Sequence, residues 1–171
     1  MKIHVGGLSE GVHEYGFRIT PAELGLPSEF RDGVDIAATL EKTSRQLLLR
    51  ASVSTTAEVE CDRCVAPLRE SLGSGYQMYY VWEESEAERI DPSEVQVMLP
   101  GQTVIDMSDD VRQTVLLALP LKHVCREDCR GLCPRCGRNL NEGSCDCKDT
   151  PVDGRWDKLK ELQNNKSNQA G

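Results

Sequence analysis

Eight cysteines in four close pairs are the residues of this chain whose type and spacing could do chemistry. Cys61 and Cys64 stand in CDRC, and the other six lie in CREDCRGLCPRCGRNLNEGSCDC, residues 125–147. Paired thiolates can bind a metal ion, form disulfides or act as a redox centre. The spacing of the pairs, and the elements that hold them, indicate which of these applies.

The stretch CPRCG gives the most specific signal, because its cysteines, Cys133 and Cys136, can direct both sulfurs at one metal ion. The proline between them preorganises the turn, and the glycine after them relieves crowding at the second ligand. After a loop of turn-forming residues, CDC supplies Cys145 and Cys147. Four thiolates in two short pairs are typical of a structural zinc site or a rubredoxin-like iron site, and we predict zinc.

The remaining pairs, Cys61 with Cys64 and Cys125 with Cys129, suggest a second four-cysteine site. Such a site would fasten the CDRC turn to the C-terminal segment. The spacing also allows the other two ways of combining four pairs; we favour the local combination, with one or two zinc ions per chain. His123 is an alternative ligand, or else a solvent-facing or core imidazole.

Disulfides and redox chemistry are the alternatives to metal binding. We expect a cytoplasmic protein, because MKIHVGGLSEGVHEYGF lacks the apolar segment of a secretory signal, and cytosolic thiols stay reduced. A redox role for CDRC stays open, although its turn does not open a helix as thioredoxin-type centres require. A zinc ion held by four cysteines has no open coordination position. With no catalytic constellation in the sequence, we predict that the chain is not an enzyme.

The net charge of −8 is unevenly spread along the chain. Residues 1–119 hold 10 basic and 20 acidic residues, and residues 120–171 hold 10 and 8, so the two parts carry −10 and +2. The acidic part disfavours non-specific binding to nucleic acid, because phosphate contacts need Lys and Arg. No apolar stretch approaches the length of about 20 residues that a membrane helix needs, and we expect no membrane partner.

Basic residues gather around the C-terminal cysteines. They could contact RNA phosphates, or they could balance the net charge of −2 that zinc and four thiolates carry together. The residues concerned are Lys122, Arg126, Arg130, Arg135 and Arg138.

Alternating apolar residues predict the strands that position CDRC. The segment 47–60 alternates most regularly, and 33–42 before it predicts a hairpin that turns at 42–45. The segment 76–82 predicts a further strand, so CDRC lies where one strand ends and the chain turns back. Its aromatic residues, Tyr76, Tyr79, Tyr80 and Trp82, either pack on the sheet or form a platform for stacking single-stranded bases.

The later segments predict helices and loops. The acidic stretch 83–94 predicts a solvated loop, and 94–106 predicts a short hairpin. A helix near 108–119, capped by Ser108, presents an apolar face to the sheet, and 155–163 could form a short amphipathic helix.

These elements predict an α+β fold, with an antiparallel-rich β-sheet, one packed helix and a C-terminal Cys-rich zinc-binding extension. We expect a β-rich core domain at 1–120, the extension at 121–163 and a disordered tail at 164–171.

The combined pattern resembles the YceD family of large ribosomal RNA subunit accumulation proteins. CDRC ends a strand, and LLLALPLKHVC, the cysteine-rich stretch and GRWDKLKEL follow it, so the resemblance covers residues 30–163. It implies a bacterial protein, with plastid relatives, that supports accumulation or processing of large-subunit rRNA. It carries over Cys61 and Cys64 as the family's Cys-x-x-Cys, and the other six cysteines as its tail. Some members keep the first pair and lack most of the tail, which implies a separate role for CDRC.

The resemblance and the residues together predict a non-enzymatic factor in ribosome large-subunit biogenesis. Its expected partner is large-subunit precursor rRNA or a pre-ribosomal particle, and a ribosomal protein or a nuclease is a further candidate. Two alternatives stay open. One is a thiol-redox or metal-transfer protein that uses Cys61 and Cys64, and the other is an adaptor that binds only protein, such as an assembly factor or nuclease.

Overall fold

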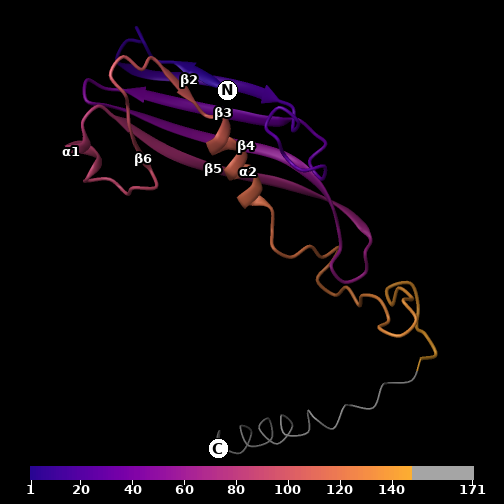
Figure 1. The fold of residues 1–171 in the computed structure, drawn as a ribbon. Helices are drawn as coiled ribbons and strands as arrows, with labels where there is room; N and C mark the ends of the chain where they lie inside the picture. Colours follow the sequence, from indigo (N-terminus) through magenta and orange to yellow (C-terminus); the bar gives the residue numbers. More distant parts are fainter. Residues whose placement is uncertain (148–171) are drawn as a thin grey trace, which may run out of the picture. The chain divides into compact units, whose positions relative to one another are not determined.

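The alternating segments of the chain form one five-stranded sheet in the computed structural model, which describes residues 1–147 (Figure 1). The strand order is β2-β3-β4-β5-β6; the first four strands pair antiparallel, and β6 pairs parallel to β5. The strands are β2 (Gly11–Ile19), β3 (Val34–Lys42), β4 (Gln46–Glu60), β5 (Pro67–Val81) and β6 (Val95–Val97). The mostly antiparallel fold confirms the predicted fold class.

Strand β4 is the centre of the core, because its alternate residues all point to one buried face. Leu47 and Leu49 are fully buried there. Leu49 stands opposite Leu40 of β3 and Met78 of β5, so the apolar face continues across three strands. The strands predicted at 33–42 and 47–60 are therefore confirmed.

Strand β5 is much longer than the predicted 76–82. Its ladder with β4 runs without a break from Glu60↔Pro67 to Gln46↔Val81. The stretch RESLGSG has small and polar side chains, so it lacks the apolar alternation that marks a strand. Backbone pairing with β4 nevertheless makes this stretch part of strand β5. CDRC forms the turn between β4 and β5, as predicted.

The hairpin predicted at 94–106 is wrong. Strand β6 pairs with β5, whereas β7 (Val104–Asp106) pairs antiparallel with β1 (Lys2–His4) in a separate two-stranded sheet. Burial explains the difference, because Ile105 stands opposite Ile3 and both side chains are buried in the core. Strands β1 and β2 were not predicted, although the alternation of Tyr15, Phe17 and Ile19 is a signal for β2.

Helix α2 (Ser108–Ala118) packs Val111, Thr114 and Val115 against the sheet, as its apolar face predicted. The predicted cap is wrong: Met107 occupies the cap position, and the Ser108 hydroxyl instead donates a hydrogen bond to Asp106 at 2.7 Å. The predicted loop at 83–94 contains a short helix, α1 (Glu84–Ala87). Within residues 1–147 no helix is long and apolar enough to cross a membrane.

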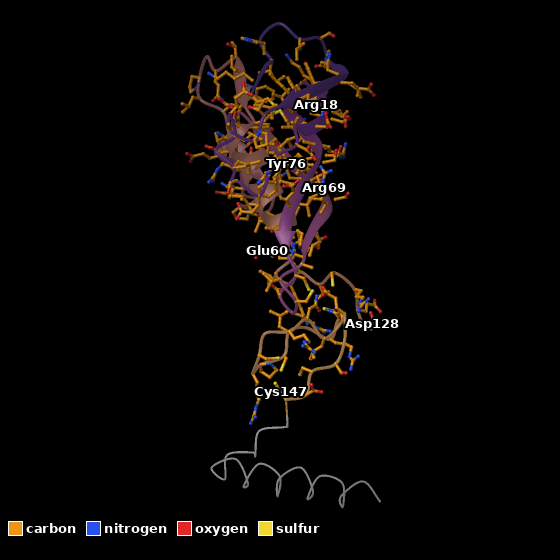
Figure 2. All side chains as sticks on the ribbon, turned by 90° about the vertical axis from the view of Figure 1, so that its right-hand side faces the viewer. Arg18, Glu60, Arg69, Tyr76, Asp128 and Cys147 are labelled. Carbon is orange, nitrogen blue, oxygen red and sulfur yellow. The ribbon has the colours of Figure 1, made fainter. Side chains whose placement is uncertain are left out.

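The aromatic residues of β5 do not form a stacking platform. Tyr80 is 1% exposed, and Tyr76 is partly buried against the core (Figure 2). Tyr79 lies on the opposite face of the strand and pairs with Val95 of β6. Trp82, just beyond the strand, is 44% exposed. Sheet packing is therefore the role that the structure gives to the two buried tyrosines.

The chain divides into two compact units, Met1–Cys129 and a second that begins at Arg130. This boundary lies later than the predicted one between residues 120 and 121, because Cys125 and Cys129 pack beside the CDRC turn. The helix predicted at 155–163 and the tail predicted at 164–171 lie outside the described residues.

Candidate metal centres

The eight cysteines form two groups, each of four sulfurs that lie within 4.8 Å of one another. The first centre lies in the first unit, and the second centre lies in the second unit. The first centre consists of Cys61, Cys64, Cys125 and Cys129, and the second of Cys133, Cys136, Cys145 and Cys147.

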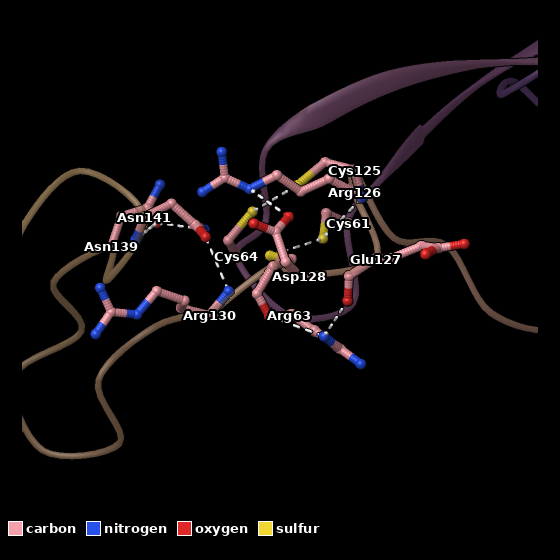
Figure 3. A network of polar contacts seen from close by, with 11 residues as sticks. Cys61, Arg63, Cys64, Cys125, Arg126, Glu127, Asp128, Arg130, Asn139 and Asn141 are labelled. Carbon is pink, nitrogen blue, oxygen red and sulfur yellow. Dashed lines mark hydrogen bonds and ion pairs between the residues drawn. The ribbon is translucent and has the colours of Figure 1, made fainter.

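The sulfur positions fit a tetrahedral metal ion. In the first centre the Cys61 and Cys129 sulfurs are 3.9 Å apart, and those of Cys64 and Cys125 are 3.7 Å apart (Figure 3). Zinc–sulfur bonds of about 2.3 Å in a tetrahedron place sulfurs about 3.8 Å apart. A disulfide needs about 2 Å, and all eight cysteines are free thiols. Both groups could therefore hold a metal ion, and the donor set of four thiolates suits zinc or iron.

The structure brings the cysteines together in the local combination that the spacing favours. His123 belongs to neither group. Its ring Nδ1 lies 3.7 Å from the carboxylate of Glu70, and its side chain is largely buried. The imidazole therefore takes the core role that was the alternative to metal binding.

The two Cys-x-x-Cys turns share one backbone geometry. The Val65 N–H donates to the Cys61 carbonyl at 2.8 Å, and the Gly137 N–H donates to the Cys133 carbonyl at 2.9 Å. The residue after the second cysteine has a left-handed backbone in both turns, with φ of 58° at Val65 and 71° at Gly137. Glycine adopts this conformation freely, whereas a β-branched residue is strained in it. Val65 is therefore a strained position in the first centre.

Backbone amides stabilise a thiolate at the first cysteine of each turn. The pKa of Cys61 is lowered to about 6 by the Cys125 N–H, which lies 3.4 Å from the sulfur, with help from Arg63 and Cys64. The pKa of Cys133 is lowered to about 6 by the Cys136 N–H and then by that of Arg135. Metal ligation requires the thiolate, so both turns are prepared for it.

One later cysteine of each group shows the opposite effect. The pKa of Cys125 is raised to about 12, first by its contact with the Cys129 thiol and then by burial. The pKa of Cys147 is raised to about 12, first by Cys136. Four thiolates so close together repel one another, so each group needs a cation before all its thiols can ionise.

Three of the four cysteines of the first centre are buried, whereas Cys125 is exposed, and contacts other than the sulfurs also hold the centre. Cys61, Cys64 and Cys129 are 1%, 6% and 4% exposed, and they pack with Ala66 and Leu68. A thiol reagent or a substrate disulfide cannot reach a sulfur buried to this degree, which weakens the redox interpretation of CDRC.

The two residues between Cys61 and Cys64 clamp the distant segment. The Arg63 guanidinium donates to the carbonyls of Glu127 at 3.1 Å and Cys129 at 2.8 Å (Figure 3). Asp62 makes a two-way contact with His123: its carboxylate accepts the His123 N–H at 2.7 Å, and its own N–H donates to the His123 carbonyl at 2.8 Å. Sequence reasoning missed this clamp, because neither residue type signals such a contact.

The second centre is closed by turns within one short segment. The Cys133 N–H donates to the Arg138 carbonyl at 2.8 Å, and the Leu140 N–H donates to the Gly131 carbonyl at 2.9 Å. The Asn141 side chain accepts the Arg130 N–H at 2.8 Å. Two of its four cysteines, Cys136 and Cys147, are exposed. Residues 130–147 have few apolar side chains, so a metal ion held by the sulfurs would be the main source of cohesion in this segment.

The five basic residues proposed for RNA contact are all exposed, but they are divided between the two units. Lys122 and Arg126 lie in the first unit, where Arg126 pairs with Asp128 at 3.3 Å. Arg130, Arg135 and Arg138 lie in the second, where the Arg138 guanidinium also donates to the Ser144 carbonyl at 2.9 Å. Arg138 therefore has a local structural role.

Comparisons with known proteins identify relatives of the chain. A family described as "Large ribosomal RNA subunit accumulation protein YceD" matches residues 49–163, a span that contains both centres. An uncharacterized protein of Mycobacterium tuberculosis is 29% identical over 146 residues, which are 84% of this chain and 70% of the relative.

Two plant relatives carry the family name. The chloroplastic large ribosomal RNA subunit accumulation protein YCED homolog 1 of Arabidopsis thaliana is 25% identical over 159 residues, 77% of this chain and 48% of the relative. The corresponding protein of Zea mays is 45% identical over 51 residues, 29% of this chain and 17% of the relative. The chain thus matches about half of the Arabidopsis protein. No solved structure matches it.

Proposed function

This chain belongs to the YceD family, which is named for large ribosomal RNA subunit accumulation, and from that membership we propose that it is a non-enzymatic ribosome-assembly factor that binds large-subunit precursor RNA or its particles. The observation that carries the binding role is the second centre. There, exposed arginines stand on turns that a bound metal ion would hold rigid.

Zinc is the ion that we propose for both centres. Four thiolates at tetrahedral spacing leave no position for a substrate or a water molecule, so the ion supplies structure. Cys61 and Cys133, whose pKa values are lowered, are the ligands prepared for binding. The ion would neutralise the repulsion among the remaining thiolates.

The arginines of the second unit are the proposed phosphate contacts. The first unit is strongly acidic and would repel a polyanion, whereas Arg130 and Arg135 lie exposed where acidic residues are few. A bound zinc would fix their turns and so reduce the conformational entropy that binding costs. Lys122 and Arg126 belong to the first unit and are proposed as separate phosphate contacts.

The test compares two double variants with equal changes of charge. Arg130→Gln with Arg135→Gln should weaken binding to large-subunit precursor RNA and lower the slope of log affinity against log salt by about 0.7 to 0.9 for each phosphate that is no longer neutralised. Arg18→Gln with Arg31→Gln is the control, because these exposed arginines pair with Asp35 and Glu58 on the sheet. The control should keep the slope, and both variants should keep their zinc.

A second measurement tests the same variant in cells. The Arg130 and Arg135 variant should lower the ratio of mature large-subunit to small-subunit rRNA, as loss of the gene would. If it binds RNA and supports rRNA accumulation as well as the control does, these arginines only balance thiolate charge, and the RNA contact is wrong.

A further inference from the structure

Strand β5 has a long edge without a partner strand in the described part of the chain. On one side it pairs with β4 over its whole length, but on the other side β6 covers only Tyr79–Val81. The edge is therefore open over residues 67–77. Within it Gly73, Ser74 and Gly75 are exposed, and their small size leaves the backbone accessible.

The backbone groups at this edge are oriented for pairing. The Tyr79 N–H donates to the Glu94 carbonyl at 2.7 Å, and the Val81 carbonyl accepts the Met98 N–H at 2.8 Å, so these two residues direct their polar groups away from β4. Alternate residues of a strand direct these groups to the same side. It follows that Gly73 and Gly75 present their N–H and C=O groups at the open edge.

A groove runs beside this edge, between β5 and α2. It has a volume of about 300 Å³, and residues 75–78 of β5 line one wall. Gln113 and Leu117 of α2 line the other, and the Leu117 side chain is 84% exposed. An exposed leucine beside an open strand edge offers both main-chain pairing and an apolar contact.

The acidic lining of the groove favours a positively charged ligand. Asp110 and Glu94 line it, and none of its lining residues is a lysine or an arginine. The Tyr76 hydroxyl, also in the lining, is buried and has no hydrogen-bond partner among the described residues. A cationic segment would complement the carboxylates, whereas a nucleic-acid strand would bring its phosphates against them.

We propose that the groove between β5 and α2 binds an extended, basic peptide segment of a partner protein, which adds to the sheet as a strand beside β5. Its main chain pairs with the edge at Gly73 and Gly75, one apolar side chain packs on Leu117, and its cations face Asp110 and Glu94. This surface belongs to the strand-built unit, so the proposal does not depend on RNA binding by the second centre.

The test uses a short fluorescein-labelled peptide of alternating lysine and valine, and a second peptide in which alternate amides are N-methylated. The second keeps the charge and side chains but loses the donors that a strand needs. Gly73→Pro removes the edge N–H of the protein, and Gly73→Ala is its control, because a Cβ there meets nothing within 4 Å. The proline should weaken peptide binding about tenfold, with alanine within about twofold of the original.

Leu117→Gln changes the α2 wall of the groove and leaves strand β5 unaltered. This variant should also weaken binding of the unmodified peptide. Circular dichroism checks that each variant is folded. If Gly73→Pro is not folded, the loss of peptide binding in Leu117→Gln is the result that tests the proposal. If the two peptides bind equally well, charge alone explains the binding, main-chain pairing plays no part, and the proposal is overturned. Binding of a short uridine oligonucleotide at this groove, abolished in Leu117→Gln, would also overturn it in favour of nucleic acid.

Discussion

The two centres have the same four ligands, but they differ in what surrounds them. The first joins segments 68 residues apart, has three of its four cysteines buried, and is also fastened by Arg63 and Asp62. The second lies within one short exposed segment whose other contacts are turns. An identical ligand set can therefore fasten a fold that already exists, or hold together a segment that has no core of its own.

The largest effect is expected at the second centre. Cys136→Ser should abolish most amide protection in residues 130–147, because structural zinc supplies about 10–16 kcal/mol of apparent binding energy in small metal-folded units. Hydrogen exchange resolved by segment measures this, with elemental analysis for zinc. Ser144→Ala in the same loop is the control. Unchanged protection would show that the turns suffice without the ion.

Cys61→Ser should have a smaller and more local effect. The variant should lose the metal of the first centre and loosen the hairpin tip and residues 123–129, while β2, β3 and most of β4 stay protected. We expect a loss of about 4–5 kcal/mol in the stability of that region, because the Arg63 and Asp62 contacts remain. Urea unfolding and segment-resolved exchange test this. Collapse of the whole sheet would contradict the comparison.

Arg63→Gln addresses the clamp itself. Loss of two hydrogen bonds from a cation to backbone carbonyls should cost about 1–3 kcal/mol. It should also speed the loss of zinc to a chelator from the first centre, and leave release from the second unchanged. Arg31→Gln, whose exposed ion pair contributes little, is the control. Equal release rates at both centres would mean that the clamp does not hold the first.

Val65 and Gly137 each follow the second cysteine of a Cys-x-x-Cys turn, and exchanging these two residue types should change the stability of the two centres in opposite directions. Val65→Gly relieves a strained left-handed backbone and should stabilise the first centre by about 1 kcal/mol or less, since glycine also gains entropy in the unfolded chain. Gly137→Val introduces that strain in the second centre and should destabilise it by about 1–3 kcal/mol. Thermal unfolding and zinc retention measure both, and effects of the same sign would contradict this interpretation.

The smallest effect is a pH dependence confined to the strand-built unit. The Ser108 hydroxyl, more than any other group, lowers the pKa of Asp106 from 3.8 to about 2. A lowered pKa adds stability above the unfolded value, and that stability is lost as the pH falls from 3.8 towards 2. Because Asp106 is half exposed, the change should stay below about 1 kcal/mol. Acid titration of unfolding should show it, and Asp106→Asn should remove it.

Residue spacing predicted the second centre and the two central strands, because ligand geometry and apolar alternation are local signals. The first centre was favoured only as the combination of the two remaining pairs, and the fold was needed to bring them together. Local signals fail where a partner that is distant in the sequence determines whether a segment forms a strand and which strand it pairs with. Residues 67–75 form a strand only because β4 pairs with them, and Ile105 pairs with Ile3 at the other end of the unit. The contact between Arg63 and Cys129 likewise requires the fold before it can be recognised.

The separation of 68 residues between Cys61 and Cys129 also sets how readily the first centre closes during synthesis. Closing a loop of that length costs about 2 kcal/mol more entropy than closing the short loop between Cys136 and Cys145. Contacts between distant residues also form more slowly. All four ligands of the first centre leave the ribosome before those of the second. The first centre nevertheless has the larger closure cost, whereas the second can capture its ion with little further cost once its own residues have emerged.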